Sequence, residues 1–253
     1  MKWVGLIAVL FTGGLLLSAV DDFPYWGNAE SPANDSVVSH YYIENTMRDT
    51  GVPNMVTAVL ADYRGFDTML ETVVVLIAVI AIMAILRVMN QTPGGAKPSA
   101  PHAIGDHHDI IVGTTCRLLV PVLQLFALYV IAHGHHSPGG GFQGGVILGT
   151  SFILLALAKG LNPVLERLPE KRYVKLAFVG VAIYAGFGVM CQFLGENFLD
   201  YGVLHVLMPA SDAAQARSHS MLGVEIGVAF TVSAIMFAIY ANLSSKGELE
   251  GGL

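Results

Sequence analysis

Three histidines lie close together in one short loop, residues 133–142, whose sequence is HGHHSPGGGF. The side chains of His133, His135 and His136 can gain or lose a proton near neutral pH, so the loop could bind or relay protons. The three consecutive glycines that follow permit a tight backbone turn. Long apolar runs flank the loop on both sides, and polar backbone beside a membrane span needs protein or water to cover it. The pattern predicts a membrane protein that handles ions or protons at one end of its helices.

Two other interpretations of the histidines remain. They could cap the C-terminus of the preceding helix, where positive charge is favoured. They could also bind zinc, but two adjacent histidines in a glycine-rich turn are poorly placed to converge on one ion, so no metal site is predicted. No cofactor-binding motif is recognised elsewhere in the chain, and no cofactor is expected.

The composition places the chain in a membrane. Of its 253 residues 54% are hydrophobic and 13% are charged, whereas a soluble domain has roughly 25% charged residues. A net charge of −6 without a basic stripe argues against a nucleic-acid partner. Cys116 and Cys191 both lie within apolar runs, which makes a disulfide framework improbable.

The apolar runs predict an all-α, polytopic fold with about six transmembrane helices. A helix needs about 20 mostly apolar residues to span a bilayer, and six stretches qualify: 3–20, 69–89, 110–132, 142–158, 173–194 and 221–243. The first could instead be a signal peptide, but its cleavage site is poor, so a retained helix is expected.

Basic residues predict the orientation, because they are enriched on the cytoplasmic side. With residue 1 inside, nine lie on one side of the membrane and three on the other. The nine are Lys2, Arg87, Lys97, Lys159, Arg167, Lys171, Arg172, Lys175 and Lys246, and the three are Arg48, Arg64 and Arg217. Both termini are therefore predicted to be cytoplasmic, in the inner (cytoplasmic) membrane of a cell, and loop 133–142 is predicted to face outward.

A stretch rich in Pro, Gly and Ala, residues 91–109, is predicted to be a cytoplasmic linker. It divides the chain into a two-helix segment, 1–90, and a four-helix domain, 110–253. Three histidines in the linker, His102, His107 and His108, are interpreted as solvated.

Two acids near the start of the second span, Asp67 and Glu71, are four residues apart and share one helix face. If that helix begins near Thr68, Asp67 is its N-cap and Glu71 favours its positive end. Alternatively the pair handles ions, with a transient Na⁺ bound between the carboxylates. Arg64 could pair with either acid.

Two further charges lie inside predicted spans, where charged side chains are rare and often functional. Arg117 lies about two turns into the third span and either snorkels to the surface or lines a hydrated path. Glu225 lies just over one turn into the last span, between Gly223 and Gly227, whose spacing favours close helix packing. That acid either points at protein or snorkels to the outer interface.

The rear part of the chain, about 109–242, resembles the B-type (MnhB-like) component of the Mrp-type multisubunit sodium/proton antiporters. The resemblance rests on RLLVP at 117–121, HGHHSPGGGFQGG at 133–145 and EIGV at 225–228. The family often has Asn where His136 stands and usually Asp where Glu225 stands. It implies that a structural loop matters for activity, here Pro138, Gly139, Gly140, Gly141 and Phe142.

The front part, about 1–90, is similar to the carboxy-terminal end of the large A-type component of the same system. It is equally similar to the small E-type component of membrane-bound hydrogenases. This resemblance rests on NMVTAVLADYRGFDTMLE at 54–71, although the family commonly has Gly where Leu70 stands. It implies that the acids matching Asp67 and Glu71 belong to the cation route.

The two resemblances imply a non-catalytic accessory subunit of a multisubunit Na⁺/H⁺ antiporter, which is part of a transporter and not an enzyme. The expected partners are large A- and D-type and small C-, E-, F- and G-type subunits, membrane lipid, Na⁺ and H⁺. Two alternatives remain open: the same module in a redox-driven complex such as a membrane-bound hydrogenase, and a purely structural connector that carries no ions.

Overall fold

The computed structural model describes residues 2–32, 34, 36–91, 110–210, 212–245 and 247. Across these residues the chain forms helices and no strand. Contacts divide the chain into two compact units, Met1–Asn45 and Thr46–Leu253. Nearly all of the predicted linker, residues 92–109, lies outside the described residues, as do its three histidines.

Six helices in the described residues are long and apolar enough to cross a membrane, which confirms the predicted all-α, polytopic fold. Their spans are Trp3–Asp22, Gly65–Val88, Ile110–Ala132, Gly141–Lys159, Glu170–Phe193 and Ala213–Ser244. The last span begins eight residues before the predicted start at 221, because Asp212 caps the helix by accepting a hydrogen bond from the backbone of Gln215 at 2.8 Å.

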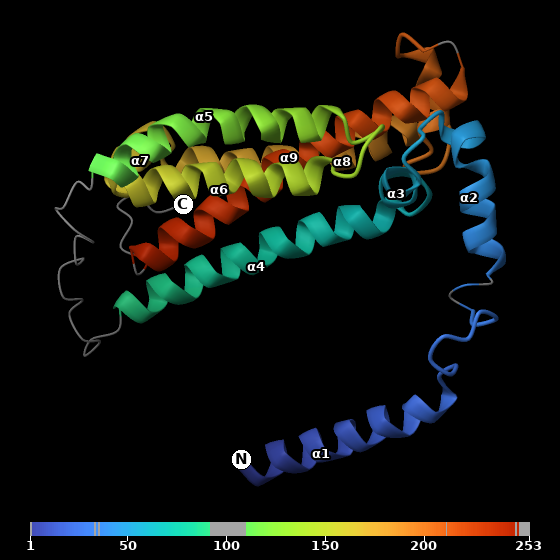
Figure 1. The fold of residues 1–253 in the computed structure, drawn as a ribbon, viewed down its shortest axis with the longest axis horizontal. Helices are drawn as coiled ribbons and strands as arrows, with labels where there is room; N and C mark the ends of the chain where they lie inside the picture. Colours follow the sequence, from blue (N-terminus) through green and yellow to red (C-terminus); the bar gives the residue numbers. More distant parts are fainter. Residues whose placement is uncertain are drawn as a thin grey trace. The chain divides into compact units, whose positions relative to one another are not determined.

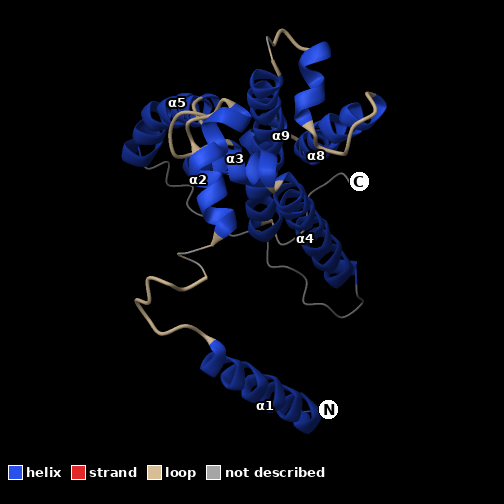
Figure 2. Ribbon diagram, turned by 90° about the vertical axis from the view of Figure 1, so that its right-hand side faces the viewer, coloured by secondary structure: helices blue, strands red, loops and turns tan. Residues whose placement is uncertain are grey.

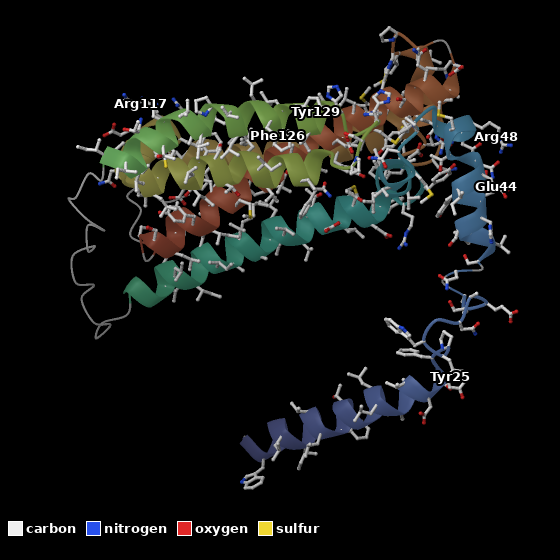
Figure 3. The ribbon with its side chains drawn as sticks, in the orientation of Figure 1. Tyr25, Glu44, Arg48, Arg117, Phe126 and Tyr129 are labelled. Carbon is white, nitrogen blue, oxygen red and sulfur yellow. The ribbon has the colours of Figure 1, made fainter. Side chains whose placement is uncertain are left out.

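The first unit contains α1 (Lys2–Ala19), the 3₁₀-helix η1 (Val20–Asp22) and most of α2 (Val37–Thr50). Within its own unit, none of the α1 span is buried, and its apolar side chains are those of a membrane-spanning helix. Tyr25 (Figure 3) and Trp26 follow it and are almost fully exposed. Aromatic residues at the end of a span are typical of the membrane–water interface.

The second unit is a bundle built around one central helix, α9 (Ala213–Ser244). It packs against α6 (Gly141–Lys159), α8 (Glu170–Phe193) and α4 (Gly65–Gln91), while α5 (Ile110–Ala132) packs on α6 (Figures 1 and 2). The short α7 (Asn162–Arg167) connects α6 and α8. In α9, 67% of the spanning window is buried, against at most 33% in the other spans.

Small side chains allow α6 to approach α9 closely. A Cβ atom at Gly145 would lie 2.9 Å from the Cβ of Val232 and 3.0 Å from the carbonyl oxygen of Ala229. Such contacts are shorter than van der Waals distance, so the backbones can only meet where this position is glycine. The loop at the start of α6 is thereby held against α9.

Helix α4 belongs to the bundle, although it lies in the predicted two-helix front segment. Leu76, Val79 and Met83 of α4 are buried in a core with Phe237 and Ala241 of α9. Full burial of each large apolar side chain contributes about 1.5–3 kcal/mol. The division by contacts therefore differs from the division predicted by family resemblance, because α4 packs with the rear helices.

The segment before α4 differs from the prediction. Residues 55–63 form α3 (Met55–Ala58) and then a π-helix, η2 (Val59–Tyr63), which leads directly into α4 at Gly65. The sequence predicted Asp67 as the N-cap of this helix. In the structure Asp67 instead lies in the first turn of α4. Thr68 donates its hydroxyl hydrogen to the carbonyl oxygen of Leu60 at 2.7 Å, which ties the first turn of α4 to the π-helix.

Candidate ion and proton site

The carboxyl group of Glu225 is enclosed by the histidine- and glycine-rich loop. Glu225 is 7% exposed, in the fourth turn of α9. A Cβ atom at Gly134 would lie 2.6 Å from its Oε2, and one at Gly140 would lie 2.5 Å from its Oε1. Any side chain at these two positions would collide with the carboxyl group, so the glycines of the loop are what admit it.

No described residue forms a hydrogen bond with Glu225 Oε2, although the atom is buried. A buried polar atom without a partner costs about 1–3 kcal/mol. The carboxyl group lies beside the N-terminus of α6, where Gly140 is the N-cap residue. The positive end of a helix favours a carboxylate. The arrangement suits a group that gains and loses a proton or a small cation.

Asn54, just before α3, anchors the front part of the bundle to the loop. Its Nδ2 donates to the carbonyl oxygens of Gly134 and Ser137, both at 2.8 Å. Its backbone N–H donates to the carbonyl oxygen of His135 at 3.0 Å, and the hydroxyl of Thr57 donates to Gly134 at 2.7 Å. Because loops carry backbone groups that need partners, Asn54 fixes the shape of the loop around Glu225.

A cavity of about 190 Å³ reaches Glu225 between α3, η2, α9 and the start of α6. Its polar lining consists of Asn54, Thr57, Thr68, Gln143, Tyr184 and Glu225, and most of the remaining lining is apolar, including Pro138 and Phe142. The cavity is large enough for several waters. The predicted loop residues thus lie around one carboxyl group and one cavity.

The three loop histidines do not converge. His135 is 8% exposed and its Nε2 lies 2.7 Å from the carbonyl oxygen of Ser218, so Nε2 carries the hydrogen. His133 is exposed and stacks on Tyr129 with ring centroids 4.1 Å apart, while His136 is exposed and its ring centroid lies 6.5 Å from that of His135. Across the described residues, no group of three or more His, Cys, Asp or Glu side chains could hold a metal ion.

Burial lowers the pKa of His135 below its usual value of 6.5, the bond to Ser218 opposes the shift, and the charges of His136 and His219 add to it. Near pH 6.5 the unfolded chain therefore binds a proton at His135, whereas the folded chain binds it only at lower pH. Stability contributed by neutral His135 is present above pH 6.5 and is lost as the pH falls from there toward the lower folded pKa.

We expect the melting temperature of the protein to fall as the pH drops below 6.5, and to fall less in His135→Gln, which keeps an N–H donor but cannot be protonated. Thermal unfolding measured across this range tests the prediction. His205→Asn, at an exposed histidine, is the matched control. An unchanged pH dependence in His135→Gln would contradict the assignment.

A buried ion pair closes the other side of η2. Arg217 of α9 donates to Asp62 from Nε at 2.7 Å and from Nη2 at 2.8 Å, and the Asp62 side chain is only 4% exposed. Burial raises the pKa of Asp62, and Arg217 opposes this shift. Arg217 is partly exposed, and the pair joins η2 to α9.

The remaining predicted residues lie away from the cavity. Asp67 and Glu71 are exposed on α4, and Asp67 forms an ion pair with Arg64 that is itself mostly exposed. Exposed pairs of this kind contribute about 0–1 kcal/mol. Arg117 is exposed on α5 (Figure 3). The sequence analysis proposed ion handling for all of these charged residues. The structure places Glu225 beside the loop, whereas Asp67 and Glu71 lie on an exposed face of α4.

Four residues of the site were not singled out from the sequence: Asn54, Asp62, Tyr184 and Arg217. Asn54 and Asp62 stand within the 54–71 motif, and Arg217 is one of the three basic residues on the side poor in positive charge. The position of Arg217 on the side with few basic residues could have indicated an acidic partner, because a basic residue there departs from the charge distribution of the chain. Nothing in the sequence pointed to Tyr184, which donates to the carbonyl oxygen of Gly65 at 2.9 Å.

Residues 111–238, about half of the chain, match the family described as a domain related to the MnhB subunit of Na⁺/H⁺ antiporter. The chain belongs to this family. The MnhB-related region contains the whole loop, Glu225 and Arg217. Residues 26–100 match a second family, MbhE, which is the E component of MBH, and this region contains Asn54, Asp62 and the exposed acids. Both predicted resemblances are confirmed.

Relatives of this MnhB family member differ in length. A putative antiporter subunit mnhB2 of Staphylococcus haemolyticus is 33% identical over 137 residues, which are 54% of this chain and 95% of the relative. A probable K⁺/H⁺ antiporter A/B subunit of Rhizobium meliloti is 28% identical over 222 residues, 81% of this chain but 21% of the relative.

Two solved structures resemble the MnhB-related chain as a whole. A chain of the Mrp complex from Dietzia sp. DQ12-45-1b has a TM-score of 0.67 and 26% identity, over 99% of this chain and 26% of that chain. A chain of an archaeal membrane-bound sulfane sulfur reductase has a TM-score of 0.58 and 25% identity, over 94% of this chain and 97% of that chain.

Proposed function

We propose that this chain is one component of a multisubunit Na⁺/H⁺ antiporter and contributes both to the cation path and to assembly. Its membership of the MnhB family and its likeness to a chain of the Mrp complex support this proposal. The observation that carries the ion-handling part is the buried Glu225 carboxyl group on the lining of a cavity, whose Oε2 has no hydrogen-bond partner among the described residues. The chain acts as part of a transporter and not as an enzyme.

Glu225 exchanges a proton or cation with the cavity in this proposal. Sodium prefers oxygen ligands, as other hard cations do, and Glu225 and Thr57 present oxygens there. The Asn54 amide holds the loop carbonyls in place. Loop 133–142 then acts as the rigid wall of the site, and His133 and His136 exchange protons with water at its rim.

Asp67 and Glu71 form a second cation-binding site in this proposal, at the surface of the chain. Glu71 is exposed within a spanning helix, between the exposed apolar side chains of Leu70 and Val74. An acid facing hydrocarbon costs several kcal/mol, so a partner protein or a hydrated path covers this face of α4. In this proposal a cation that crosses the complex passes Asp67 and Glu71 on the covered face of α4. Arg64 and Arg117 are fixed positive charges beside hydrated regions.

The orientation and partners follow from the same proposal. The basic residues favour cytoplasmic termini in the inner membrane, with the Glu225 cavity and loop toward the outside. Large A- and D-type and small C-, E-, F- and G-type subunits cover the exposed apolar faces, together with lipid. The front segment, 1–90, supplies the A-type part of the complex, and residues 110–253 supply the MnhB-like domain.

We expect Glu71→Gln to lower sodium-dependent proton movement by the whole complex in everted vesicles while assembly stays normal. The amide has the shape of the acid but lacks the charge that attracts Na⁺. Glu166→Gln, at an exposed acid of α7 outside the spans, is the matched control and should transport normally. Full antiport by an assembled Glu71→Gln complex would contradict a cation-binding role for Glu71 and leave it as an interface residue.

A second candidate has one specific observation in its favour. The likeness to the sulfane sulfur reductase extends over 97% of that chain, so the same module could serve a redox-driven membrane complex. In that setting the chain still handles ions and holds no redox cofactor. Co-purification of the chain with its native partners distinguishes the two, because a redox-driven complex would bring metal-cluster proteins with it.

A further inference from the structure

A second cluster of buried polar groups lies at the end of the bundle remote from the loop. Glu170 is the first residue of α8, and Asn242 is in the last turn of α9. They are 6% and 0% exposed. Asn242 is 17 residues beyond Glu225, about 25 Å along a helix, so this cluster is separate from the candidate ion site.

Two acceptor atoms of this cluster lack a donor. Glu170 Oε1 forms an ion pair with Arg87 of α4, but no described residue donates to Glu170 Oε2. Asn242 Nδ2 donates to the carbonyl oxygen of Ala238 at 2.9 Å, which fixes the orientation of the amide. Its Oδ1 likewise has no donor in the described part of the chain.

The hydroxyl of Tyr173 connects the two residues. Tyr173 is fully buried and lies three residues after Glu170, on the same face of α8. Its oxygen accepts a hydrogen bond from Asn242 Nδ2 at 3.4 Å, so its own hydrogen is available for donation.

We propose that Glu170, Tyr173 and Asn242 form a binding site for one structural water molecule. One water molecule supplies what the cluster lacks: two hydrogens, for Glu170 Oε2 and Asn242 Oδ1, and one lone pair, for the Tyr173 hydroxyl. Three hydrogen bonds are also the usual number for a buried water. A metal cation fits less well, because Arg87 already neutralises the Glu170 carboxylate.

The water joins α8 to α9, and through Glu170 it holds Arg87 of α4. The site therefore locks three helices at this end of the bundle, while Asn54 and the Asp62–Arg217 pair lock the other end. This inference does not rest on the proposed function. It applies whether the chain carries ions or only connects other proteins.

Hydroxyl-radical labelling of the assembled complex by pulsed X-ray radiolysis tests the site, because radiolysis of a bound water produces radicals that modify the adjacent side chain. Tyr173 should be modified at a measurable rate although it is fully buried. Asn242→Leu removes one acceptor at similar volume and should lower the Tyr173 rate several-fold. Tyr240→Phe, a partly buried tyrosine of α9, is the matched control and should leave the rate unchanged.

A high-resolution density map of the same complex gives the second measurement and serves if Asn242→Leu does not assemble. One peak within hydrogen-bonding distance of Glu170 Oε2, Asn242 Oδ1 and the Tyr173 hydroxyl is expected, and it should be lost in Tyr173→Phe or Asn242→Leu. An equal Tyr173 rate in the wild type and in Asn242→Leu would overturn the proposal. So would a side chain of a partner protein at this position, or a peak that depends on Na⁺.

Discussion

A complex that carries Glu225→Gln should assemble at normal levels and lose most of its sodium-dependent proton movement. The amide keeps the shape that Gly134 and Gly140 enclose but cannot bind or release a proton at this position. Interactions with a charged group contribute about 1.5–3 kcal/mol, and each 1.4 kcal/mol changes a rate about tenfold. We therefore expect roughly a 10- to 100-fold lower rate, measured as dequenching of a pH-sensitive dye in everted vesicles on addition of Na⁺.

Two outcomes separate transport from structure. Glu225→Asp keeps the charge on a shorter side chain and should retain part of the activity. The assembled amount of each variant is measured in the same vesicles by native gel electrophoresis. A Glu225→Gln complex that assembles and transports normally would show that the carboxyl group only packs against the loop, and the ion-handling role would fall.

Gly140→Ala should disturb both the loop and the Glu225 carboxyl group. The new Cβ would lie 2.5 Å from Glu225 Oε1, and φ at this position is +112°, which side chains rarely adopt. Backbone strain of this kind costs about 1–3 kcal/mol before the collision is counted. The loop or the carboxyl group must move, so we expect both less assembled complex and a lower rate of transport per complex.

Gly186→Ala is the matched control, because a Cβ atom at this position in α8 meets nothing within 4 Å. It should assemble and transport as the wild type does. The amount of assembled complex and the melting temperature of the purified complex report the effect of each variant. If Gly140→Ala equals Gly186→Ala in both measurements, the close approach of loop and carboxyl group does not occur in the complex.

The helix count was predictable because a span is a local property. A run of about 20 apolar residues marks it whatever surrounds the run, and the six predicted stretches coincide with the six spans of the structure within a few residues, apart from the early start of α9. The ends of α4 and α9 were less predictable. Their first residues depend on the five-residue π-helix before Gly65 and on the Asp212 cap, which are too short to change the pattern of apolar residues.

The candidate site was only partly predictable from types and spacing. Loop 133–142 stood out because polar, glycine-rich backbone between two spans needs a reason. Glu225 stood out because acids inside spans are rare. Neither signal indicated that the loop encloses Glu225, since the two lie more than 80 residues apart in the sequence. Asp67 and Glu71 were singled out by the same rule, yet they face outward from α4.

The sequence by itself determined the membrane class, the number of spans, the family and the short list of charged residues, because each depends on composition or on a contiguous motif. Only the tertiary structure decided which of those residues share a site. Packing of α6 and α4 against α9 brings Gly134, Gly140 and Asn54 to Glu225, and Asp62 to Arg217. Contacts between distant segments depend on how whole helices pack, which no local pattern encodes.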